Sequence, residues 1–112
     1  MGFDAADVII VPFPFTDRNT TKRRPAVVIS AAAFNAATGH IVAAMITSAR
    51  TSVWGSDIPL TDLAAAGLPT PCVIRLKLFT LDAGLIVRTA GRLSPGDAAA
   101  LTETLAATIV PQ

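Results

Sequence analysis

The sequence is poor in cysteine, histidine and charge. Its one cysteine, Cys72, cannot form an internal disulfide, a zinc cluster or a CxxC redox pair. The one histidine, His40, excludes catalysis by two histidines of one chain, and no metal-binding spacing of the HExxH kind occurs. Only 15% of the residues are charged, well below the quarter usual in soluble domains. This shortage indicates that part of the surface packs against a partner, most simply a second copy.

The sequence pattern also predicts neither a signal peptide nor a membrane span. The first residues, Met1 to Asp4, carry an acid where a signal peptide carries positive charge. Residues 25–49 contain no Asp, Glu, Lys or Arg and are numerous enough to cross a bilayer. Their middle, Asn35 to His40 (NAATGH), is typical of a turn and costly in hydrocarbon. We therefore expect two buried strands joined by a loop, in a soluble cytoplasmic protein.

The chain has the length and apolar content of one folded domain. It has 112 residues, of which 52% are hydrophobic, and a mean hydropathy of +0.57. These values exclude a disordered chain and leave no room for a second catalytic domain. We expect residues 1–112 to form a single domain.

The first strand signal runs from Asp7 to Phe15. Alternate residues from Ile9 to Phe15 are apolar, which predicts one buried face. Pro12 and Pro14 fall on the other parity, and their missing N–H groups prevent a regular ladder on that side. This stretch should therefore be a sheet edge, or should leave the sheet there.

The remaining pattern predicts a run of short strands followed by a helix. Ser94, Pro95 and Asp97 supply an N-cap, a first-turn proline and an acid at the positive end of the helix dipole. Leu101, Leu105 and Ile109 recur every four residues and predict one apolar stripe. Further strands are expected at 25–30, 40–47, 53–60, 71–81 and 85–92. Short helical turns are expected at 31–37 and 61–67, the second with Thr61 or Asp62 as cap and Gly67 as terminator. This order favours a mainly β, strongly bent antiparallel barrel with a C-terminal helix.

The cations are concentrated in one segment although the net charge is only +1. Arg18, Lys22, Arg23 and Arg24 place four of the nine cations within seven positions, opposed only by Asp17. A basic loop between two strands suits phosphate binding, because guanidinium groups match phosphate oxygens. A solvated loop that keeps an apolar protein soluble is the alternative reading.

Several motifs together resemble the MazF/PemK family of toxin endoribonucleases. The resemblance begins with Asp7 to Asp17 (DVIIVPFPFTD) and Lys22 to Ser30 (KRRPAVVIS). It continues through residues 43–48 (AAMITS), 65–69 (AAGLP) and 91–94 (GRLS), in the family's order and over nearly the whole chain. One departure is Ala6, where the family usually has glycine before the aspartate. This difference concerns the start of the first strand and not the residues that carry the chemistry.

The resemblance implies an SH3-like barrel, a homodimer, and cleavage of single-stranded RNA at short motifs without a metal or other cofactor. It also implies a cognate antitoxin that lays an extended acidic segment along the RNA groove. The family's catalytic residues are an Arg before Pro at the start of the second strand and a Thr at the end of the third, here Arg24 and Thr47. The products would be a 2′,3′-cyclic phosphate and a 5′-hydroxyl.

The residue chemistry is compatible with these roles. Arg24 suits charge stabilisation on the phosphorane, since a guanidinium is always charged and is a poor base. Thr47 can hydrogen-bond a phosphate oxygen from a strand end, although threonine is a common strand residue in any case. We expect RNA contacts from Arg18, Lys22, Arg23, Ser48, Arg50 and Lys77, in a groove shared by two subunits.

Other residues are weaker candidates. His40 has the intrinsic pKa for acid–base work but is expected in a turn at the far end of the strand from Thr47. Arg75 could extend the basic groove, Phe15 and Trp54 could stack on bases, and Cys72 is best explained as a small buried hydrophobe. Two other functions remain open. One is a non-catalytic toxin related to the gyrase-poisoning barrels, and the other is a degenerate member that only binds RNA or its antitoxin.

Overall fold

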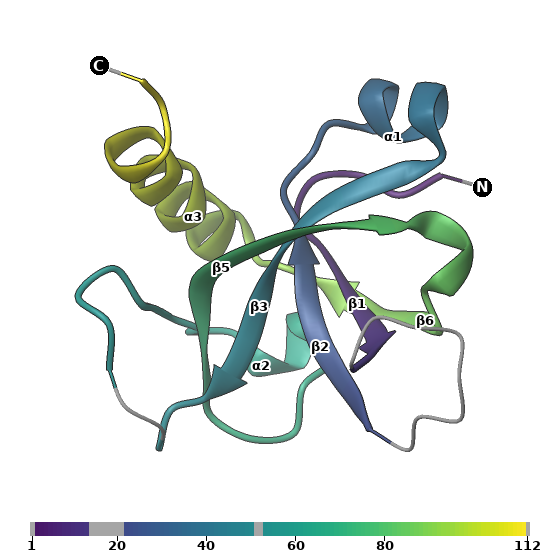
Figure 1. Cartoon of the computed structure of the whole chain (residues 1–112). Coiled ribbons are helices and arrows are strands. Elements are labelled where there is room, and N and C mark those ends of the chain that lie inside the picture. The colour runs from purple at the N-terminus through teal and green to yellow at the C-terminus, as the bar shows by residue number, and fades with distance from the viewer. Residues whose placement is uncertain (1, 14–21, 51–52, 112) are drawn as a thin grey trace.

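The computed structural model describes residues 2–13, 22–50 and 53–111. Figure 1 shows a curled sheet with one long helix, α3, against it and two short helices at its margins. The elements follow the order β1 (Asp7–Pro12), β2 (Arg23–Val28), α1 (Ala32–Thr38), β3 (His40–Ser48), β4 (Ile58–Pro59), α2 (Leu63–Ala66), β5 (Cys72–Asp82), the 3₁₀ turn η1 (Ala83–Leu85), β6 (Arg88–Arg92) and α3 (Pro95–Thr108).

The sheet has six strands in the order β4-β5-β3-β2-β1-β6, and every neighbouring pair is antiparallel. It curls into a half-barrel (Figure 1), which confirms the expected mainly β antiparallel barrel with a C-terminal helix. The uncharged stretch 25–49 contributes β2, α1 and β3 to this fold. No helix in the described part of the chain is long and apolar enough to span a membrane.

Each face of the sheet carries its own apolar cluster. On one face Val27, Ile46 and Ile74 pack with Leu101 of α3 and Ala66 of α2. The other face holds a second cluster, made up of Ile9, Val11, Ala26, Val28, Ile41, Ala43 and Leu81. Side chains alternate between the faces along each strand, so two-sided burial explains why β2 and β3 are almost continuously apolar.

β1 is shorter than predicted and lies inside the sheet, between β2 and β6. It ends at Pro12, whereas the sequence pattern suggested a strand to Phe15; residues 14 and 15 lie outside the described part of the chain. The pairing with β6 ends at Ile10, so Pro12 needs no N–H on that side. On the other side Pro12 pairs with Arg23, and Phe13 N donates to Lys22 O at 3.0 Å. β1 therefore loses its β6 neighbour before Pro12 but stays paired with β2, so it is neither a sheet edge nor a strand that leaves the sheet at Pro12.

The predicted strand at 53–60 is largely wrong. Only Ile58–Pro59 pairs with β5, and a turn occupies residues 54–57. The Asp57 carboxylate accepts the Trp54 N–H at 2.9 Å, and Asp57 N donates to Trp54 O at 3.1 Å. This carboxylate also binds Arg75 of β5, a long-range contact that outweighs the local β propensity of the segment.

The helix ends follow the predicted capping signals. The Ser94 hydroxyl accepts the Asp97 N–H, Asp62 caps α2, and Gly67 ends α2 with φ of +73°. The apolar stripe of α3 is shorter than predicted. Leu101 is buried, but Ile109 lies beyond the helix and is 47% exposed.

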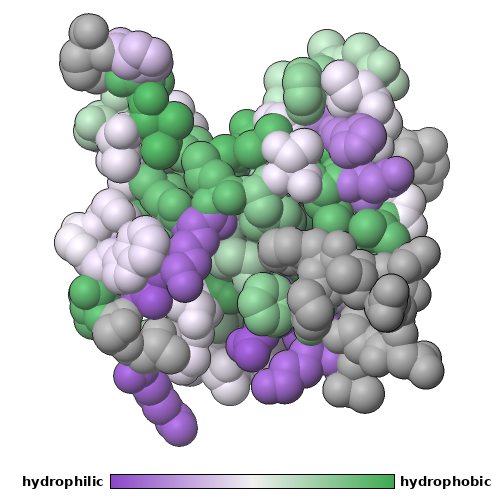
Figure 2. Space-filling view, viewed as in Figure 1, coloured by the Kyte–Doolittle hydropathy of each residue, from purple (hydrophilic) through white to green (hydrophobic). Residues whose placement is uncertain are grey.

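Apolar surface remains visible in the space-filling view. Figure 2 shows it in the notch between α1 and α3, above a more polar lower half. Exposed large apolar side chains among the described residues include Phe34, Leu78, Val87, Ile109 and Val110.

Candidate functional site

Arg24 and Thr47 lie at the same end of two neighbouring strands. The pairing of β2 with β3 ends at Ala26 and Met45, and Arg24 and Thr47 each lie two residues beyond this last pair. Side chains two residues apart in a strand share one face, so both lie on the face of Ala26 and Met45. The Arg24 side chain is exposed and its guanidinium carbon lies 5.5 Å from the centroid of the Phe13 ring. The sheet register thus brings together two residues that are 23 positions apart.

Three adjoining hollows surround this pair. The first, called here the Phe13 hollow, has a volume of about 180 Å³ and is lined by Phe13, Arg24, Met45, Ile46, Thr47, Arg75 and Lys77. The second, the Leu68 hollow, measures about 290 Å³ and also contains Arg24, Ile46 and Thr47 in its wall. Ser48 and Thr70 connect it to the third, the Arg50 hollow, of about 420 Å³. Arg24 and Thr47 therefore stand between two hollows of a continuous row.

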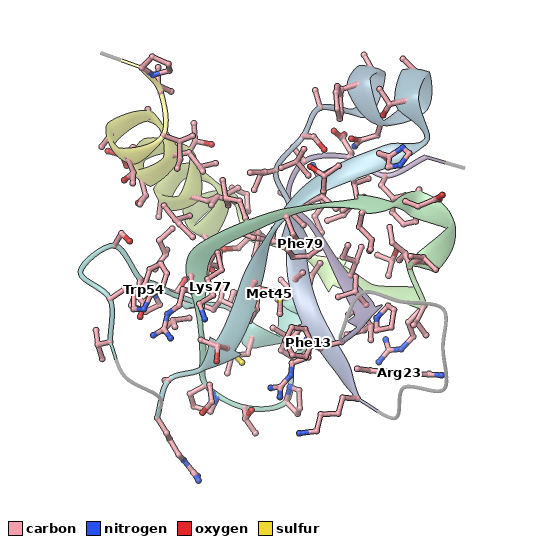
Figure 3. All side chains as sticks on the ribbon, in the orientation of Figure 1. Phe13, Arg23, Met45, Trp54, Lys77 and Phe79 are labelled. Atoms are coloured by element: carbon pink, nitrogen blue, oxygen red, sulfur yellow. The ribbon has the colours of Figure 1, made fainter. Side chains whose placement is uncertain are left out.

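A β-bulge shapes one wall of the Phe13 hollow. On β3 and β5, Ala44 pairs with Leu78 and the next residue, Met45, pairs with Arg75, so the register skips Leu76 and Lys77. Bulges commonly redirect side chains beside functional sites. Here Lys77 is exposed and lines the hollow together with Arg75. Figure 3 shows Phe13, Met45, Lys77 and Trp54 across the same part of the molecule.

Arg75 is held by a buried ion pair with Asp57. Its Nε donates to Asp57 Oδ1 at 3.0 Å and one terminal nitrogen donates to Oδ2 at 2.7 Å. Only 8% of the Arg75 side chain and 5% of the Asp57 side chain are exposed. The hydrogen bond from Arg75 lowers the pKa of Asp57, and the reciprocal bond raises the pKa of Arg75. Both groups are therefore charged at neutral pH.

Trp54 completes this arrangement as a cation–π partner. The Arg75 guanidinium carbon lies 5.2 Å and Lys77 Nζ lies 5.8 Å from the Trp54 ring centroid. The Asp57 carboxylate fixes the backbone of Trp54 while Arg75, its ion-pair partner, contacts the ring. We call Trp54, Asp57 and Arg75 the tryptophan clamp; it fixes the wall from which Lys77 projects.

The Leu68 hollow depends on close backbone packing. A Cβ on Gly67 would lie 2.0 Å from Ala90 O, and one on Gly91 would lie 2.4 Å from Ala65 O. Both glycines thus allow the end of α2 to approach β6 and place residues 67–70 in the hollow wall. Cys72 also lines this wall; its Sγ donates to Thr70 O at 3.0 Å, and burial raises the pKa of its thiol. The hollow contains a further cation, Arg88.

The predicted RNA-binding residues fall into three groups. Lys77 lines the Phe13 hollow, Ser48 lines the Leu68 and Arg50 hollows, and Arg50 lines the latter. Lys22 and Arg23 are exposed and lie beside the end of β1, where Arg23 pairs with Pro12, but neither lines one of the three hollows. Arg18, like the base-stacking candidate Phe15, lies outside the described residues.

His40 lies where the sequence suggested, exposed at the opposite end of β3 from Thr47. Its Nδ1 is 2.9 Å from Thr38 O. Several residues that line the hollows were not among the sequence candidates, including Phe13, Met45 and Arg88. Residue type does not distinguish them from core or surface residues, and only the strand register would have placed Phe13 and Met45 beside Arg24. Within the described residues, no three His, Cys, Asp or Glu side chains are close enough together to hold one metal ion.

Comparison with known proteins finds solved structures with the same architecture. A search of curated proteins gives no significant match. Among solved structures, a MazE–MazF complex from Deinococcus radiodurans is similar over 100% of this chain and 99% of that one, with a TM-score of 0.76 and 23% identity. An endoribonuclease in complex with its cognate antitoxin from a mycobacterial species covers 99% of this chain and 97% of its own, with a TM-score of 0.75 and 16% identity.

A third structure, the Mycobacterium tuberculosis toxin MazF-mt6, covers 90% of this chain and 93% of its own, with a TM-score of 0.70 and 19% identity. At these identities the structural matches show a shared fold. The family model for the PemK-like, MazF-like toxin of type II toxin–antitoxin systems matches residues 4–109. That match spans both strands that carry Arg24 and Thr47, and the chain belongs to the PemK-like, MazF-like toxin family.

Proposed function

We propose that this chain is a sequence-specific endoribonuclease toxin of a type II toxin–antitoxin system, acting on single-stranded RNA without a metal. The observation that carries the proposal is that Arg24 and Thr47 both line two adjoining hollows of one row. The row contains cations from three strands, Arg24, Lys77 and Arg88. Cations that follow a groove are the basis of nucleic-acid backbone binding.

In the proposed reaction the RNA supplies its own nucleophile. The 2′-oxygen attacks the adjacent phosphorus, the bond from phosphorus to the 5′-oxygen breaks, and the proton lost from the 2′-hydroxyl is balanced by one gained at the 5′-oxygen. The products are a 2′,3′-cyclic phosphate and a 5′-hydroxyl. The protein must hold the phosphate in line for this attack and stabilise the negative charge that develops on it.

Arg24 and Thr47 divide this work. The Arg24 guanidinium donates planar hydrogen bonds to the non-bridging oxygens and stabilises the phosphorane, while remaining protonated. The Thr47 hydroxyl donates a further hydrogen bond from a rigid strand position. Lys22, Arg23, Ser48 and Arg50, with Arg18, contact the RNA on either side of the cut.

Two partners follow from the same proposal. A cognate antitoxin with an extended acidic segment occupies the cationic row and blocks RNA; the Deinococcus and mycobacterial relatives were both solved with an antitoxin. A second copy of the chain completes a homodimer. The exposed apolar side chains and the low charged fraction support this. The family match over residues 4–109 supports a single toxin domain spanning residues 1–112.

The test is cleavage of a long RNA by the purified protein in EDTA. We expect cuts at a short recurring sequence, with fragment 5′ ends that polynucleotide kinase labels without prior dephosphorylation. Arg24→Ala should reduce the rate by at least about 100-fold. Arg92→Ala is the matched control, since this arginine lies on β6 and pairs with Asp7 outside the three hollows. Cleavage by Arg24→Ala at the wild-type rate would refute the assignment.

A further inference from the structure

We infer that the Phe13 hollow is a single-base subsite that selects guanine or uracil over adenine and cytosine, with Lys77 as the residue that reads the base. This inference rests on the proposed function, because it assigns a base preference to the RNA that the toxin binds. Guanine and uracil present a carbonyl oxygen at the position where adenine and cytosine present an amino group.

The size and walls of the hollow suit one base. Its volume of about 180 Å³ is below the range of about 300–1,000 Å³ typical of pockets for drug-sized ligands, so it accommodates a ring system and not a whole nucleotide. Phe13, 39% exposed, supplies an aromatic wall, and Met45 supplies a deformable apolar surface. Aromatic side chains that stack on unpaired bases are the usual means of single-strand recognition.

Among the described residues, the charged groups of the hollow are all donors, and the Thr47 hydroxyl can both donate and accept. Arg24, Arg75 and Lys77 line it, and no carboxylate does so among the described residues. The nearest acid of the tryptophan clamp, Asp57, is already bound to Arg75. A carbonyl oxygen finds a partner here. An amino group meets other donors and leaves its hydrogens and those of the protein unpaired, which is unfavourable in a partly desolvated site.

Lys77 is the cation best placed to read the base. Arg75 is committed to Asp57 and Trp54, and Arg24 lies at the shared wall where the phosphate is cut. Lys77 projects from the β5 bulge into the hollow and keeps its ammonium 5.8 Å from the Trp54 centroid. This contact with the Trp54 ring favours one position of the Lys77 ammonium, which reduces the rotamer entropy lost on binding.

The fluorescence of Trp54 can be used to measure oligonucleotide binding in the Phe13 hollow. Trp54 is the only tryptophan, and the chain has no tyrosine, so the intrinsic fluorescence comes from a residue in contact with Lys77. We would titrate the protein with 2′-O-methyl tetranucleotides of uridine and of cytidine, which cannot be cleaved. Uracil and cytosine are similar in size and differ in the exocyclic group, so the ratio of the two dissociation constants isolates the choice of base.

The wild type should bind the uridine oligonucleotide on the order of tenfold more tightly. Lys77→Met keeps most of the stem and removes the ammonium, and it should bring the ratio close to one. Arg92→Ala should keep the wild-type ratio. Circular dichroism of each variant separates loss of preference from loss of fold. Equal binding of the two oligonucleotides by the wild type, or a wild-type ratio in Lys77→Met, would overturn the inference.

Sequencing of cleavage sites distinguishes this inference from the proposed function. In a long RNA, one fixed position of the cut motif should be guanine or uracil for the wild type, and Lys77→Met should relax that position alone. Cleavage with no such position would overturn the base subsite and leave the ribonuclease intact. A preserved uridine preference that depends on Lys77, in a protein that cuts no RNA, would refute the ribonuclease and support the subsite.

Discussion

Arg24 and Thr47 lie at the same end of β2 and β3, and both belong to the shared wall of the Phe13 and Leu68 hollows. A phosphate at this position would have one hollow on either side of it. Under the proposed function, this position would hold the scissile phosphodiester between two subsites, as a cut at a defined sequence requires.

Replacement of the Thr47 hydroxyl tests its share of the reaction. Thr47→Val keeps the branched shape and should lower the cleavage rate about 10–100-fold, because one donor to the developing phosphorane is lost. The matched control is Thr80→Val, an exposed threonine of β5 that pairs with Val42 away from the hollows. Single-turnover rates on one short RNA are the measurement, and equal rates for the two variants would show that the hydroxyl takes no part.

The tryptophan clamp predicts a spectroscopic change in Asp57→Asn. The neutral amide no longer compensates Arg75 and holds Trp54 less firmly, so the tryptophan emission should shift to longer wavelength. Asp82→Asn, which alters an acid that caps η1, provides the comparison. The uridine preference should weaken together with the spectral shift. An unchanged emission maximum in Asp57→Asn would show that the ring does not depend on the ion pair.

Asp97 anchors α3 to the segment before α2. It is 2% exposed, and its carboxylate accepts the Thr61 N–H, the Thr61 hydroxyl and the Asp62 N–H. Burial alone would raise its pKa, but these hydrogen bonds outweigh burial and lower it. Asp97→Ala should therefore cost about 2–3 kcal/mol of unfolding free energy, since three hydrogen-bond donors lose a charged acceptor.

The hydrogen bonds to the Asp97 carboxylate make its contribution to the free energy of unfolding depend on pH. A carboxyl whose folded pKa is depressed stabilises the fold above its unfolded pKa, near 4, and loses that contribution as the pH falls through the folded value. The difference in urea unfolding free energy between wild type and Asp97→Asn should thus be largest near neutral pH and shrink below about pH 4. A difference that stays constant down to pH 2 would assign the stabilisation to shape and not to charge.

The backbone conformation of Ala6 predicts that glycine at this position stabilises the fold. The Ala6 φ of +77° lies in the left-handed region, which costs an L-residue about 1–2 kcal/mol. Ala6→Gly removes that strain, but glycine also raises the entropy of the unfolded chain, which cancels about half of the benefit. We therefore expect the free energy of unfolding to rise by roughly 0.5–1 kcal/mol. The backbone bonds from Ala6 N to Val28 O and from Leu93 N to Ala6 O should persist. Ala5→Gly, at a residue without positive φ, should instead destabilise; a higher Tm for Ala5→Gly than for Ala6→Gly would contradict this.

Local signals in the sequence predicted the elements whose causes are local. The Ser94 cap, the Gly67 terminator and the alternation of β1 each depend on a few adjacent residues, and each was placed within a few positions. The strand expected at 53–60 failed because its conformation depends on Arg75, about 20 positions away. Propensity contains no information about such a partner.

In the candidate site, too, local sequence identified some residues, and others depend on strand pairing. Arg24 and Thr47 were identified through motifs, and the structure brings them together by strand register. Phe13 and Met45 were missed because an exposed aromatic beside a proline, or a methionine within an apolar strand, has no distinctive local pattern. The β5 bulge that directs Lys77 is likewise a property of pairing between two strands.

The bulge at Leu76 and Lys77 places the residue proposed to read the base on a different strand from the residues proposed to cut. Arg24 and Thr47 belong to β2 and β3, whereas Lys77 belongs to β5. Under the two proposals, a substitution at Lys77 changes the base preference and leaves both proposed catalytic side chains in the protein. Sequence preference and cleavage chemistry could then evolve separately on this scaffold.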